Sequence, residues 1–492
     1  MATTPMNPVD AAWYHMDGPA NLAMVTGVML ARERFDFEHV RDLFARRIVA
    51  FDRFRQRVVE RGFPIASPCW DDMPGFDIDQ HVHHAALPAP HDHAALIRLI
   101  DDIASTPLDR EQPLWQVHVV DDVDGGSALV MRYHHCIADG TAMMAVVRHL
   151  ADESSETPAE PAAGSAADDA EPAGGTPDPG LATISRAAAS ALAAALDAIV
   201  HPQQLLDRAA LALQGTEMLV SELLKRPDPS SPFKGRFGMR KRVAWSQPVA
   251  IDDVKVIGAA SGAKVNDVLV AAMTGALRGY LRRRGVDVDD TTVRAMVPVD
   301  LRRPERARRL GNEFGLVILD LAVASRRRKD RLAKTQARMD ALKRSPEAVA
   351  ILALFNLFGR MPKAIEDLAI DLFGSKASVV MTNVVGPRTM LRFADVPIER
   401  MMFWVPHPGR QLGLGVSILS YRGTATLSVI ADARLVPDPD AITADFNREF
   451  TAMLRQARKD AAAAPPPKAG SGERRAPAAT RRAAAHRRPH TG

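Results

Sequence analysis

Two adjacent histidines, His134 and His135, close an apolar run in the stretch MRYHHCIADG at 131–140, and Asp139 and Gly140 follow them. An imidazole titrates near neutral pH and can take a proton from an alcohol or an amine, so either histidine could be a general base. Asp139 could cap the next helix or form a salt bridge that fixes the histidine loop. Gly140 can adopt the backbone angles of a sharp strand-to-helix turn.

The residues before the pair, SALVMRY at 127–133, predict a strand that separates the two histidines. Because side chains alternate between the faces of a strand, His135 shares a face with Tyr133 and His134 shares the opposite face with Arg132. One histidine can therefore line a cavity while the other is held by hydrogen bonds in the supporting wall. The same separation argues against a single metal ion gripped by both, and we expect no metal site.

The other candidates for unusual chemistry have simpler interpretations. The stretch HVHHAALPAPHDH at 81–93 predicts an edge strand that runs into a proline-rich turn. Cys136 is most simply a small core residue. The chain has only two cysteines, Cys69 and Cys136, and they are not in a CxxC spacing. Two cysteines cannot form a disulfide framework, which fits a protein of the reducing cytosol.

Strands and helices alternate around the histidine pair and again later in the chain. A hairpin of strands at 115–120 and 127–133 precedes a helix at 141–152. The second half contains a helix at 265–285 and a strand at 376–382, then a hairpin of 412–420 with 424–433 and a closing helix at about 440–459. These patterns predict an α/β protein of two halves.

A chain of 492 residues with 47% hydrophobic content is too long for one ordinary core. Residues 151–180 hold eight acidic and no basic residues and predict a disordered linker between a first half at 1–150 and a helical bridge at 181–240. The second half occupies 241–460. A low-complexity basic tail at 461–492 is also expected to be disordered.

Charge and hydropathy narrow the partners and the compartment. The whole chain has a net charge of +4, and the tail alone contributes +6. The rest of the chain therefore has a net charge of −2, which is close to neutral and gives no indication of nucleic-acid binding. The N-terminus has no signal-peptide pattern, and apolar runs such as 348–355 are shorter than the roughly 20 residues of a membrane span. We expect a cytoplasmic protein whose membrane contact is peripheral. The basic tail could touch anionic lipid or serve only solubility.

The motif HHxxxDG, filled by His134, His135, Asp139 and Gly140, resembles the signature of CoA- and carrier-dependent acyltransferases. Further stretches, in the same order, resemble the bacterial bifunctional wax ester synthase/diacylglycerol acyltransferase family over about 5–455, the acidic linker excluded. They are PLW at 113–115, VNDVLVAA at 265–272, VPVDLR at 297–302, GNEFG at 311–315, TNVVGP at 382–387 and LGLGVSILSYRGTATLSVIAD at 412–432.

The resemblance implies two chloramphenicol-acetyltransferase-like α/β subdomains joined by a helical linker, with an active-site channel between them. It implies transfer of a fatty acyl group from acyl-CoA to diacylglycerol, giving triacylglycerol, or to a long-chain alcohol, giving a wax ester. Acyl-CoA is then a co-substrate, and no cofactor is expected. A membrane or lipid-inclusion surface is a further possible partner.

The resemblance also implies roles for the motif. His135 becomes the general base, and His134 and Asp139 support it. Arg302 of VPVDLR becomes the ion-pair partner of Asp139 across the two halves, although Asp300 stands where the family often has a small polar residue.

Several further residues are candidates with two interpretations each. Asn266 begins a helix and could donate a hydrogen bond to the oxyanion that forms during acyl transfer, or it could merely cap the helix. Asp267 beside it is a candidate substrate contact. Trp115 could be a core aromatic or a wall of the acyl channel. Thr382 and Asn383 precede a turn that could approach the substrate or be structural only.

Two other functions fit parts of the sequence. A condensation-type enzyme would share the histidine motif but take its acyl group from a carrier protein. A lipid-surface binding protein would keep the fold without catalysis. The acceptor, the acyl chain length and the ratio of the two esters are not readable from the sequence.

Overall fold

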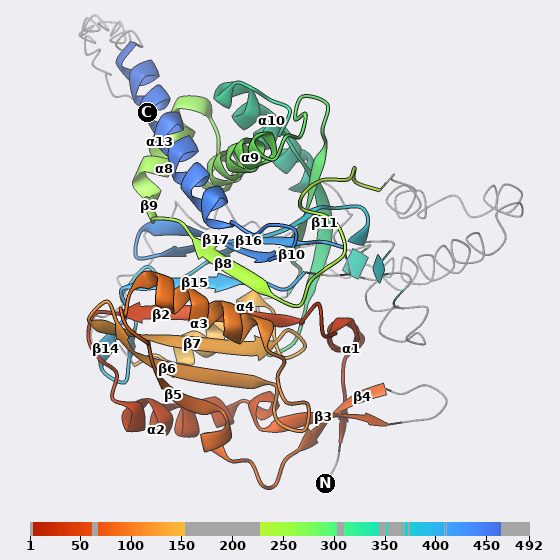
Figure 1. Ribbon diagram of the computed structural model, residues 1–492, viewed down its shortest axis with the longest axis vertical. Helices are drawn as coiled ribbons and strands as arrows, with labels where there is room; N and C mark the ends of the chain where they lie inside the picture. The colour runs from red at the N-terminus through yellow and green to blue at the C-terminus, as the bar shows by residue number, and fades with distance from the viewer. Residues whose placement is uncertain are drawn as a thin grey trace, which may run out of the picture.

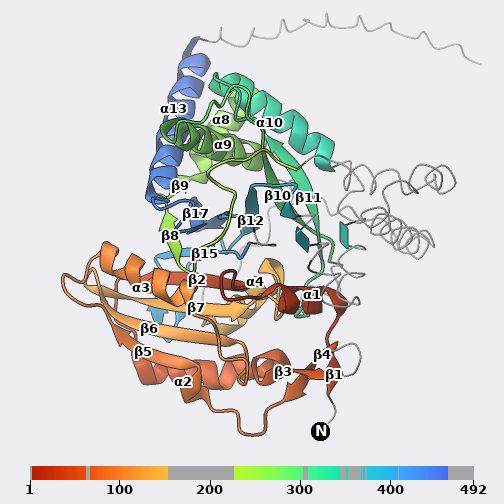
Figure 2. The same cartoon turned by 45° about the vertical axis from the view of Figure 1, so that its right-hand side comes forward.

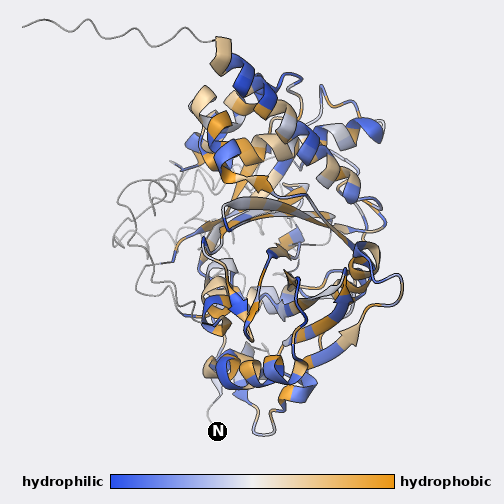
Figure 3. Ribbon diagram, turned by 90° about the vertical axis from the view of Figure 1, so that its left-hand side faces the viewer, coloured by the Kyte–Doolittle hydropathy of each residue, from blue (hydrophilic) through white to orange (hydrophobic). Residues whose placement is uncertain are grey.

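The computed structural model describes residues 3–61, 67–152, 227–302, 309–343, 351–352, 367, 370–371, 374–407, 409 and 411–463. Two β-sheets lie one above the other; helices pack on both faces of the lower sheet and above the upper one (Figure 1). Apolar residues concentrate in the sheets and on the inner faces of the helices (Figure 3). The described part of the chain is therefore mixed α/β, as the sequence predicts.

The N-terminal half is built on the sheet β15-β2-β7-β6-β5. Its strands are β2 (Met24–Ala31), β5 (Val82–Ala86), β6 (Trp115–Val123), β7 (Gly126–His134) and β15 (Arg400–Trp404). Helix α3 (His93–Ser105) packs on one face, against residues such as Val28 and Val130. Helices α1 (Pro8–Met16), α2 (Phe37–Arg47) and α4 (Gly140–Leu150) join the core of the other face, which includes Met29 and Leu129. Alternate residues of each strand thus bury against different helices.

The C-terminal half has the sheet β11-β10-β12-β16-β17-β8, and β9 pairs with β17. The strands are β8 (Lys241–Trp245), β9 (Val249–Ala250), β10 (Val293–Asp300), β11 (Phe314–Leu321), β12 (Val379–Val385), β16 (Leu414–Tyr421) and β17 (Thr424–Asp432). Helices α8 (Ile251–Ser261), α9 (Val265–Arg283), α10 (Arg328–Lys343) and α13 (Asp440–Ala463) lie on the far side of this sheet (Figure 2).

Minor elements complete the described chain. A three-stranded sheet of β1 (Thr4–Pro5), β4 (Ser67–Asp72) and β3 (Gln56–Arg61) flanks α1, and β13 (Arg392–Phe393) pairs with β14 (Val396–Pro397). Short 3₁₀ turns occupy Ile48–Ala50, Asp52–Phe54 and Ile78–Gln80.

Strand β15 ties the two halves together. It comes from the second half of the chain yet pairs with β2 as the edge strand of the first sheet, with Phe403 opposite Gly27. A core cluster accordingly contains residues of both halves, among them Met131, Met296 and Met401. The sheet of the first half is therefore not completed within 1–150.

The main elements agree with the sequence predictions within a few residues. Both predicted hairpins are present, with turns at Asp124-Gly125 and Arg422-Gly423 in the positive-φ region that favours glycine. Strand β5 is an edge strand, as 81–93 predicts. The closing helix α13 runs to Ala463, beyond the predicted end of the second half.

Of the predicted linker at 151–180, only 151–152 are among the described residues, and most of the predicted bridge and tail lie outside them. The part of the bridge that is described, 227–240, contains no helix. Among the described helices, none alone is long and apolar enough to cross a bilayer. Helices α8 and α9 reach that length and hydropathy only as a pair, bent by 95°.

Candidate active site

The two histidines of the motif stand where β7 ends and the chain turns toward α4. His134 is the last residue of β7, opposite Met24 of β2, and the His135 backbone N–H donates to the Ala23 carbonyl at 2.7 Å. The strand therefore sends the two imidazoles to opposite sides, as its alternation predicts. His135 lines a chamber between the halves, and His134 does not.

His135 is held by contacts on one face of its ring and at one ring nitrogen. Its ring stacks on Trp13 of α1, with centroids 4.0 Å apart and planes 10° apart. Its Nδ1 lies 3.0 Å from Oδ1 of Asn312, which comes from the loop before β11. Because these contacts occupy one ring face and one nitrogen, the Nε2 edge is what His135 presents to the chamber.

Asn312 determines which nitrogen of His135 carries the proton. Its amide Nδ2 donates to the His135 carbonyl at 2.8 Å and to Oδ1 of Asp10 at 2.7 Å. The amide oxygen is thereby turned toward Nδ1, so Nδ1 must be the donor and Nε2 keeps its lone pair. This tautomer is assigned from the hydrogen-bond network. A lone pair at Nε2 is what a general base requires.

Asp10 and Arg53 support Asn312 from behind. Asp10 is fully buried, accepts the Asn312 backbone N–H at 2.9 Å and pairs with Arg53 at 2.8 Å. Burial raises the pKa of Asp10 to about 6 although Arg53 opposes the shift. Arg53 also donates to the carbonyls of Cys136 and Ile137, so the same pair fixes the loop that follows the histidines.

Asp139 both caps α4 and forms an ion pair. One carboxylate oxygen accepts the Ala142 N–H at 2.9 Å, and the other accepts from Arg302 and from the Glu313 N–H. Arg302 and Asp139 are both buried, and Arg302 also donates to the Gly311 carbonyl at 2.8 Å. The predicted pair of Asp139 with Arg302 is therefore present, and capping and ion pairing occur together.

His134 points into the wall behind the chamber. Its Nδ1 accepts the Cys136 backbone N–H at 3.1 Å, and its Nε2 lies 3.9 Å from Asp17. Burial lowers the pKa of both histidines to about 4, so both are neutral at pH 7. The geometry gives His134 a role in holding the loop.

The chamber in front of His135 is lined by both halves and has mixed polarity. It encloses about 850 Å³, counting the solvent at its mouth. The predicted residues Asp139, Gly140, Thr382 and Asn383 all reach it, and so do Thr141 and Asp300. Asp300 accepts from the Thr141 hydroxyl at 2.9 Å, so the aspartate that departs from the family pattern braces the start of α4.

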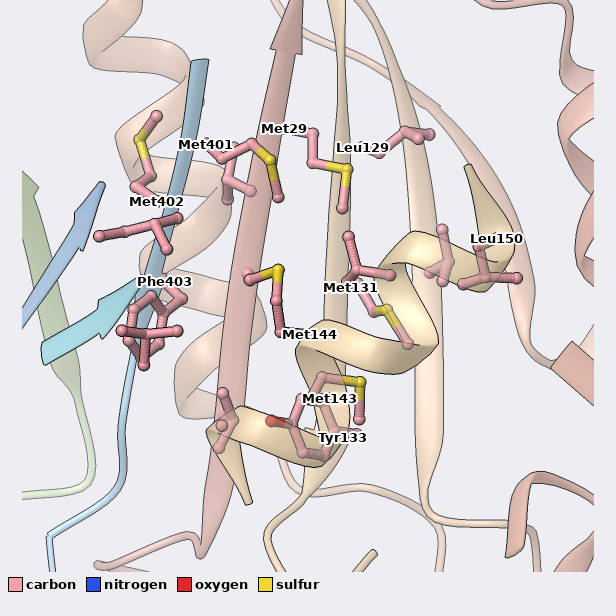
Figure 4. A pocket seen from close by; sticks show the side chains of 18 of the residues that line it. Met29, Leu129, Met131, Tyr133, Met143, Met144, Leu150, Met401, Met402 and Phe403 are labelled. Carbon is pink, nitrogen blue, oxygen red and sulfur yellow. The ribbon is translucent and has the colours of Figure 1, made fainter. Parts of the chain in front are cut away.

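An apolar pocket continues the chamber into the N-terminal half. It encloses about 730 Å³, counting its mouth, and is lined by six methionines: Met29, Met131, Met143, Met144, Met401 and Met402. The chamber and the pocket share Val25, Tyr133, Gly140, Val384 and Phe403. Figure 4 shows the methionines of β2, β7, α4 and β15 converging on one space.

Gly140 lies at the junction of the two cavities. A Cβ at this position would come within 3.3 Å of Val384 Cγ2, which lines both cavities. The absence of a side chain here keeps the passage from chamber to pocket open.

The structure corrects the predictions for the start of α9. Lys264, not Asn266, is the N-cap, and Asp267 is buried with Oδ2 accepting the Lys264 N–H at 3.0 Å. Asp267 is therefore a capping residue away from the chamber, not a substrate contact. Asn266 does not line the chamber either, but its Oδ1 accepts from Nδ2 of Asn383 at 2.9 Å. Gly285 follows the end of this helix with φ +76, a left-handed conformation that favours glycine.

Of the two roles considered for Trp115, the structure shows the core aromatic and not the substrate-contacting wall of an acyl channel. Its side chain is completely buried, and its Nε1 donates to the Phe54 carbonyl at 2.8 Å. It stacks on His81 and lies behind Phe44, whose ring centroid is 6.2 Å away. Phe44 reaches the pocket and Trp115 does not.

Sequence reasoning missed the residues that hold His135 from behind. Asn312 lies within GNEFG, and Asp10 and Trp13 lie in the opening segment, but nothing in their local pattern assigns them a role. Asn312 and Trp13 contact His135, and Asp10 acts on it through Asn312, only because α1 and the loop before β11 fold against the same turn.

Comparison with known proteins gives matches along most of the chain. The family described as wax ester synthase/diacylglycerol acyltransferase catalytic domain matches residues 6–269, more than half of the chain, and the WS/DGAT C-terminal domain matches 310–454. The probable diacylglycerol O-acyltransferases tgs1 and tgs2 of Mycobacterium tuberculosis are 28% and 29% identical. The alignments cover 80% and 81% of this chain and 83% and 87% of those proteins.

Two solved structures share the fold. The wax ester synthase/diacylglycerol acyltransferase of Marinobacter aquaeolei VT8 aligns with a TM-score of 0.65 at 20% identity, covering 92% of this chain and all of that one. The first condensation domain of the calcium-dependent antibiotic synthetase aligns with a TM-score of 0.55 at 16% identity, covering 94% and 97%.

Proposed function

The chain belongs to the wax ester synthase/diacylglycerol acyltransferase family, and we propose that His135 is the general base of its acyl-CoA-dependent O-acyl transfer. The protein is an acyltransferase that makes triacylglycerol from diacylglycerol, wax ester from long-chain alcohol, or both. One observation carries the role of His135: Asn312 holds its Nδ1, which leaves the Nε2 lone pair facing a chamber that opens into an apolar pocket.

The proton path follows from this tautomer. Nε2 of His135 takes the hydroxyl proton of the acceptor as its oxygen attacks the thioester carbonyl carbon. The tetrahedral intermediate then collapses, the C–S bond breaks, and the imidazolium returns the proton to the CoA sulfur. Asn312 accepts from Nδ1 throughout, and the Asp139 carboxylate raises the stability of the transient imidazolium, as its effect on the pKa of His135 indicates.

The oxyanion of the intermediate needs a hydrogen-bond donor about 3 Å away. We assign this role to Asn383, which lines the chamber. Asn266 contacts Asn383 but does not line the chamber, so we do not assign the role to it. Asn266 accepts one of the two amide hydrogens of Asn383, so it orients the other. Thr382 lines the same wall and is a further substrate contact.

The reaction needs no cofactor, because a thioester is already an activated acyl donor and the steps are proton transfers and acyl transfer. His135 and the side chains around it supply the base and the orientation. Acyl-CoA is accordingly a co-substrate.

We further propose that this protein is cytoplasmic and acts at the surface of a membrane or lipid inclusion, where diacylglycerol and long-chain alcohols reside. Two observations favour this. Val385, two residues after Asn383, has 69% of its surface exposed. The tail at 461–492 carries seven Lys and Arg residues against one acidic residue.

The test is an assay of the purified protein with labelled palmitoyl-CoA and diacylglycerol, hexadecanol, or both in competition. We expect radiolabelled ester and free CoA in equal amounts. Turnover only with an acyl group on a carrier protein would replace this function with a condensation reaction. Lipid binding without turnover, unchanged in His135→Ala, would leave a binding protein.

A further inference from the structure

Tyr133 brings a hydroxyl group to a surface that is otherwise apolar. It lines both the chamber in front of His135 and the apolar pocket that continues it. Among the described residues that line the pocket, Tyr133 alone has a side-chain oxygen or nitrogen atom. Figure 4 shows this oxygen among labelled side chains that hold only carbon and sulfur. A polar atom therefore stands at the boundary between the two cavities.

The Tyr133 hydroxyl has no hydrogen-bond partner within the described part of the chain, although the residue is only 4% exposed. The chain has four tyrosines. The other three hydroxyls are paired: Tyr14 with Arg110, Tyr280 with Asp438 and Arg284, and Tyr421 with the Leu391 N–H and the Ile398 carbonyl. An unpaired buried hydroxyl destabilises a fold, and phenylalanine would fill the same space without that cost. The hydroxyl of Tyr133 is therefore suited to a partner that the substrate supplies.

The hydroxyl can donate a hydrogen bond without giving up its proton. Burial, and to a smaller extent the negative charge of Asp139, raise the pKa of the Tyr133 phenol far above its usual value. The phenol is therefore neutral at pH 7. A hydrogen bond that it donates inside apolar walls is stronger than the same bond in water, and strongest to an acceptor that carries negative charge.

Tyr133 is within reach of the reacting carbonyl group. It lies two residues before His135 on the same face of the strand, so the two Cα atoms are about 7 Å apart. The attacking oxygen must lie about 3 Å from Nε2 of His135, and the thioester carbonyl carbon about 3 to 3.5 Å further on. The carbonyl group is then about 6 to 7 Å from His135, which is the separation between His135 and Tyr133.

Asn383 reaches the same boundary from the other half of the chain. It lines the chamber, and the next residue, Val384, lines both cavities as Tyr133 does. Tyr133 comes from β7 of the first sheet and Asn383 from β12 of the second. An oxygen atom between the two halves can therefore accept one hydrogen bond from each.

We propose that the Tyr133 hydroxyl donates a hydrogen bond to the oxyanion of the tetrahedral intermediate, as a second donor beside Asn383. This rests on the proposed acyl transfer. As the acceptor oxygen bonds to the carbonyl carbon, the π electrons of the C=O bond move to the carbonyl oxygen, and both donors stabilise that charge. When the C=O bond forms again, the C–S bond breaks and the proton on His135 passes to the CoA sulfur. Tyr133 keeps its own proton throughout.

Tyr133→Phe removes only the hydroxyl and leaves the ring in place. It should lower kcat about 10²-fold, the lower end of the loss that an oxyanion donor causes, because Asn383 remains. KM should change little, and the urea midpoint should stay the same or rise because an unpaired hydroxyl is removed. The matched control is Tyr280→Phe in α9, whose hydroxyl donates to Asp438 at 2.6 Å. It should leave kcat unchanged.

An unreactive ligand separates this role from packing against the substrate. S-Hexadecyl-CoA is a thioether that has the chain and the CoA of palmitoyl-CoA but no carbonyl oxygen. Its Kd, measured by calorimetry, should be the same for the parent and for Tyr133→Phe. An unchanged kcat, a thioether Kd that rises by the factor by which kcat falls, or a loss of folding in Tyr133→Phe would each overturn the proposal. Failure of the proposed function would look different, because the parent itself would then form no ester.

Discussion

Asn312 contacts His135 at two points: its Nδ2 donates to the His135 carbonyl at 2.8 Å, and its Oδ1 lies 3.0 Å from Nδ1 of the imidazole. The two residues are 177 positions apart in the chain. One amide therefore fixes both the backbone and the tautomer of the proposed base. The second half of the chain thus determines the chemical state of a residue that belongs to the first.

Replacing Asn312 should lower the rate more than the affinity. In Asn312→Ala, Nδ1 loses its acceptor and the imidazole can adopt the wrong tautomer, so kcat should fall by at least about 10- to 100-fold, the loss seen when a partner that orients a metal-bound histidine is removed. KM should change little because Asn312 does not line the chamber. Asn447→Ala, which removes a half-buried asparagine bonded to the backbone of Gln247 away from the chamber, is the matched control. An equal fall in that control, or a purely KM effect, would contradict this role.

The two histidines of the motif should respond differently to alanine. His135→Ala should lower kcat about 10²- to 10⁴-fold, the usual contribution of a general base. His134→Ala leaves the buried Cys136 N–H without its acceptor and should cost about 1 to 3 kcal/mol of unfolding free energy. Its kcat per folded molecule should stay within tenfold of the parent. Single-turnover assays together with urea unfolding separate the two, and an inverted pattern would exchange their roles.

Breaking the buried pair of Asp139 and Arg302 should destabilise the fold. Arg302→Met leaves the Asp139 carboxylate buried without its charged partner, which should cost about 3 to 5 kcal/mol of unfolding free energy. Arg240→Met removes an exposed pair with Asp102, whose side chains are 72% and 65% exposed, and should cost less than about 1 kcal/mol. Urea midpoints give the comparison. Similar losses in both variants would mean that the pair contributes no more than a surface one.

Asn383 and Asn266 should behave as one unit. Asn383→Ala should lower kcat by the factor of about 10²–10³ that the loss of an oxyanion donor causes. Asn266→Ala should have a smaller effect, because Asn266 acts through Asn383. The double variant should be no slower than Asn383→Ala alone. Additive losses would show that the two amides act separately.

The fall of kcat/KM at acid pH should occur at a pH well below the pKa of a free imidazole. Burial lowers the pKa of His135 to about 4, so the base stays unprotonated as the pH falls and is lost only near that value. We expect kcat/KM to stay level from pH 8 to about 6.5. The raised pKa of Asp10, about 6, can add an inflection there, which Asp10→Asn should remove. An inflection near 6.5 that persists in Asp10→Asn would contradict a buried neutral base.

The sequence by itself determined the main elements, and the resemblance that it carries singled out His135 as the proposed base. The alternation of SALVMRY placed His134 and His135 on opposite faces, and the motif with its companion stretches indicated the family and its two-half fold. These features depend on neighbouring or regularly spaced residues, so they can be read from the sequence without the tertiary structure. The pairing of Asp139 with Arg302 came from the resemblance and is present in the structure.

Only the tertiary structure decided what surrounds the base. Trp115 was a candidate wall of the acyl channel and Asp267 a candidate substrate contact, yet both are satisfied by neighbours away from the chamber: the Phe54 carbonyl and the Lys264 N–H. Asn312 and Asp10 had no such signal, yet Asn312 holds His135 and Asp10 holds Asn312. Strand β15 closes the pocket from far along the chain. A hydrogen bond or a cavity wall depends on which distant segments pack together, and local spacing in a sequence does not contain that information.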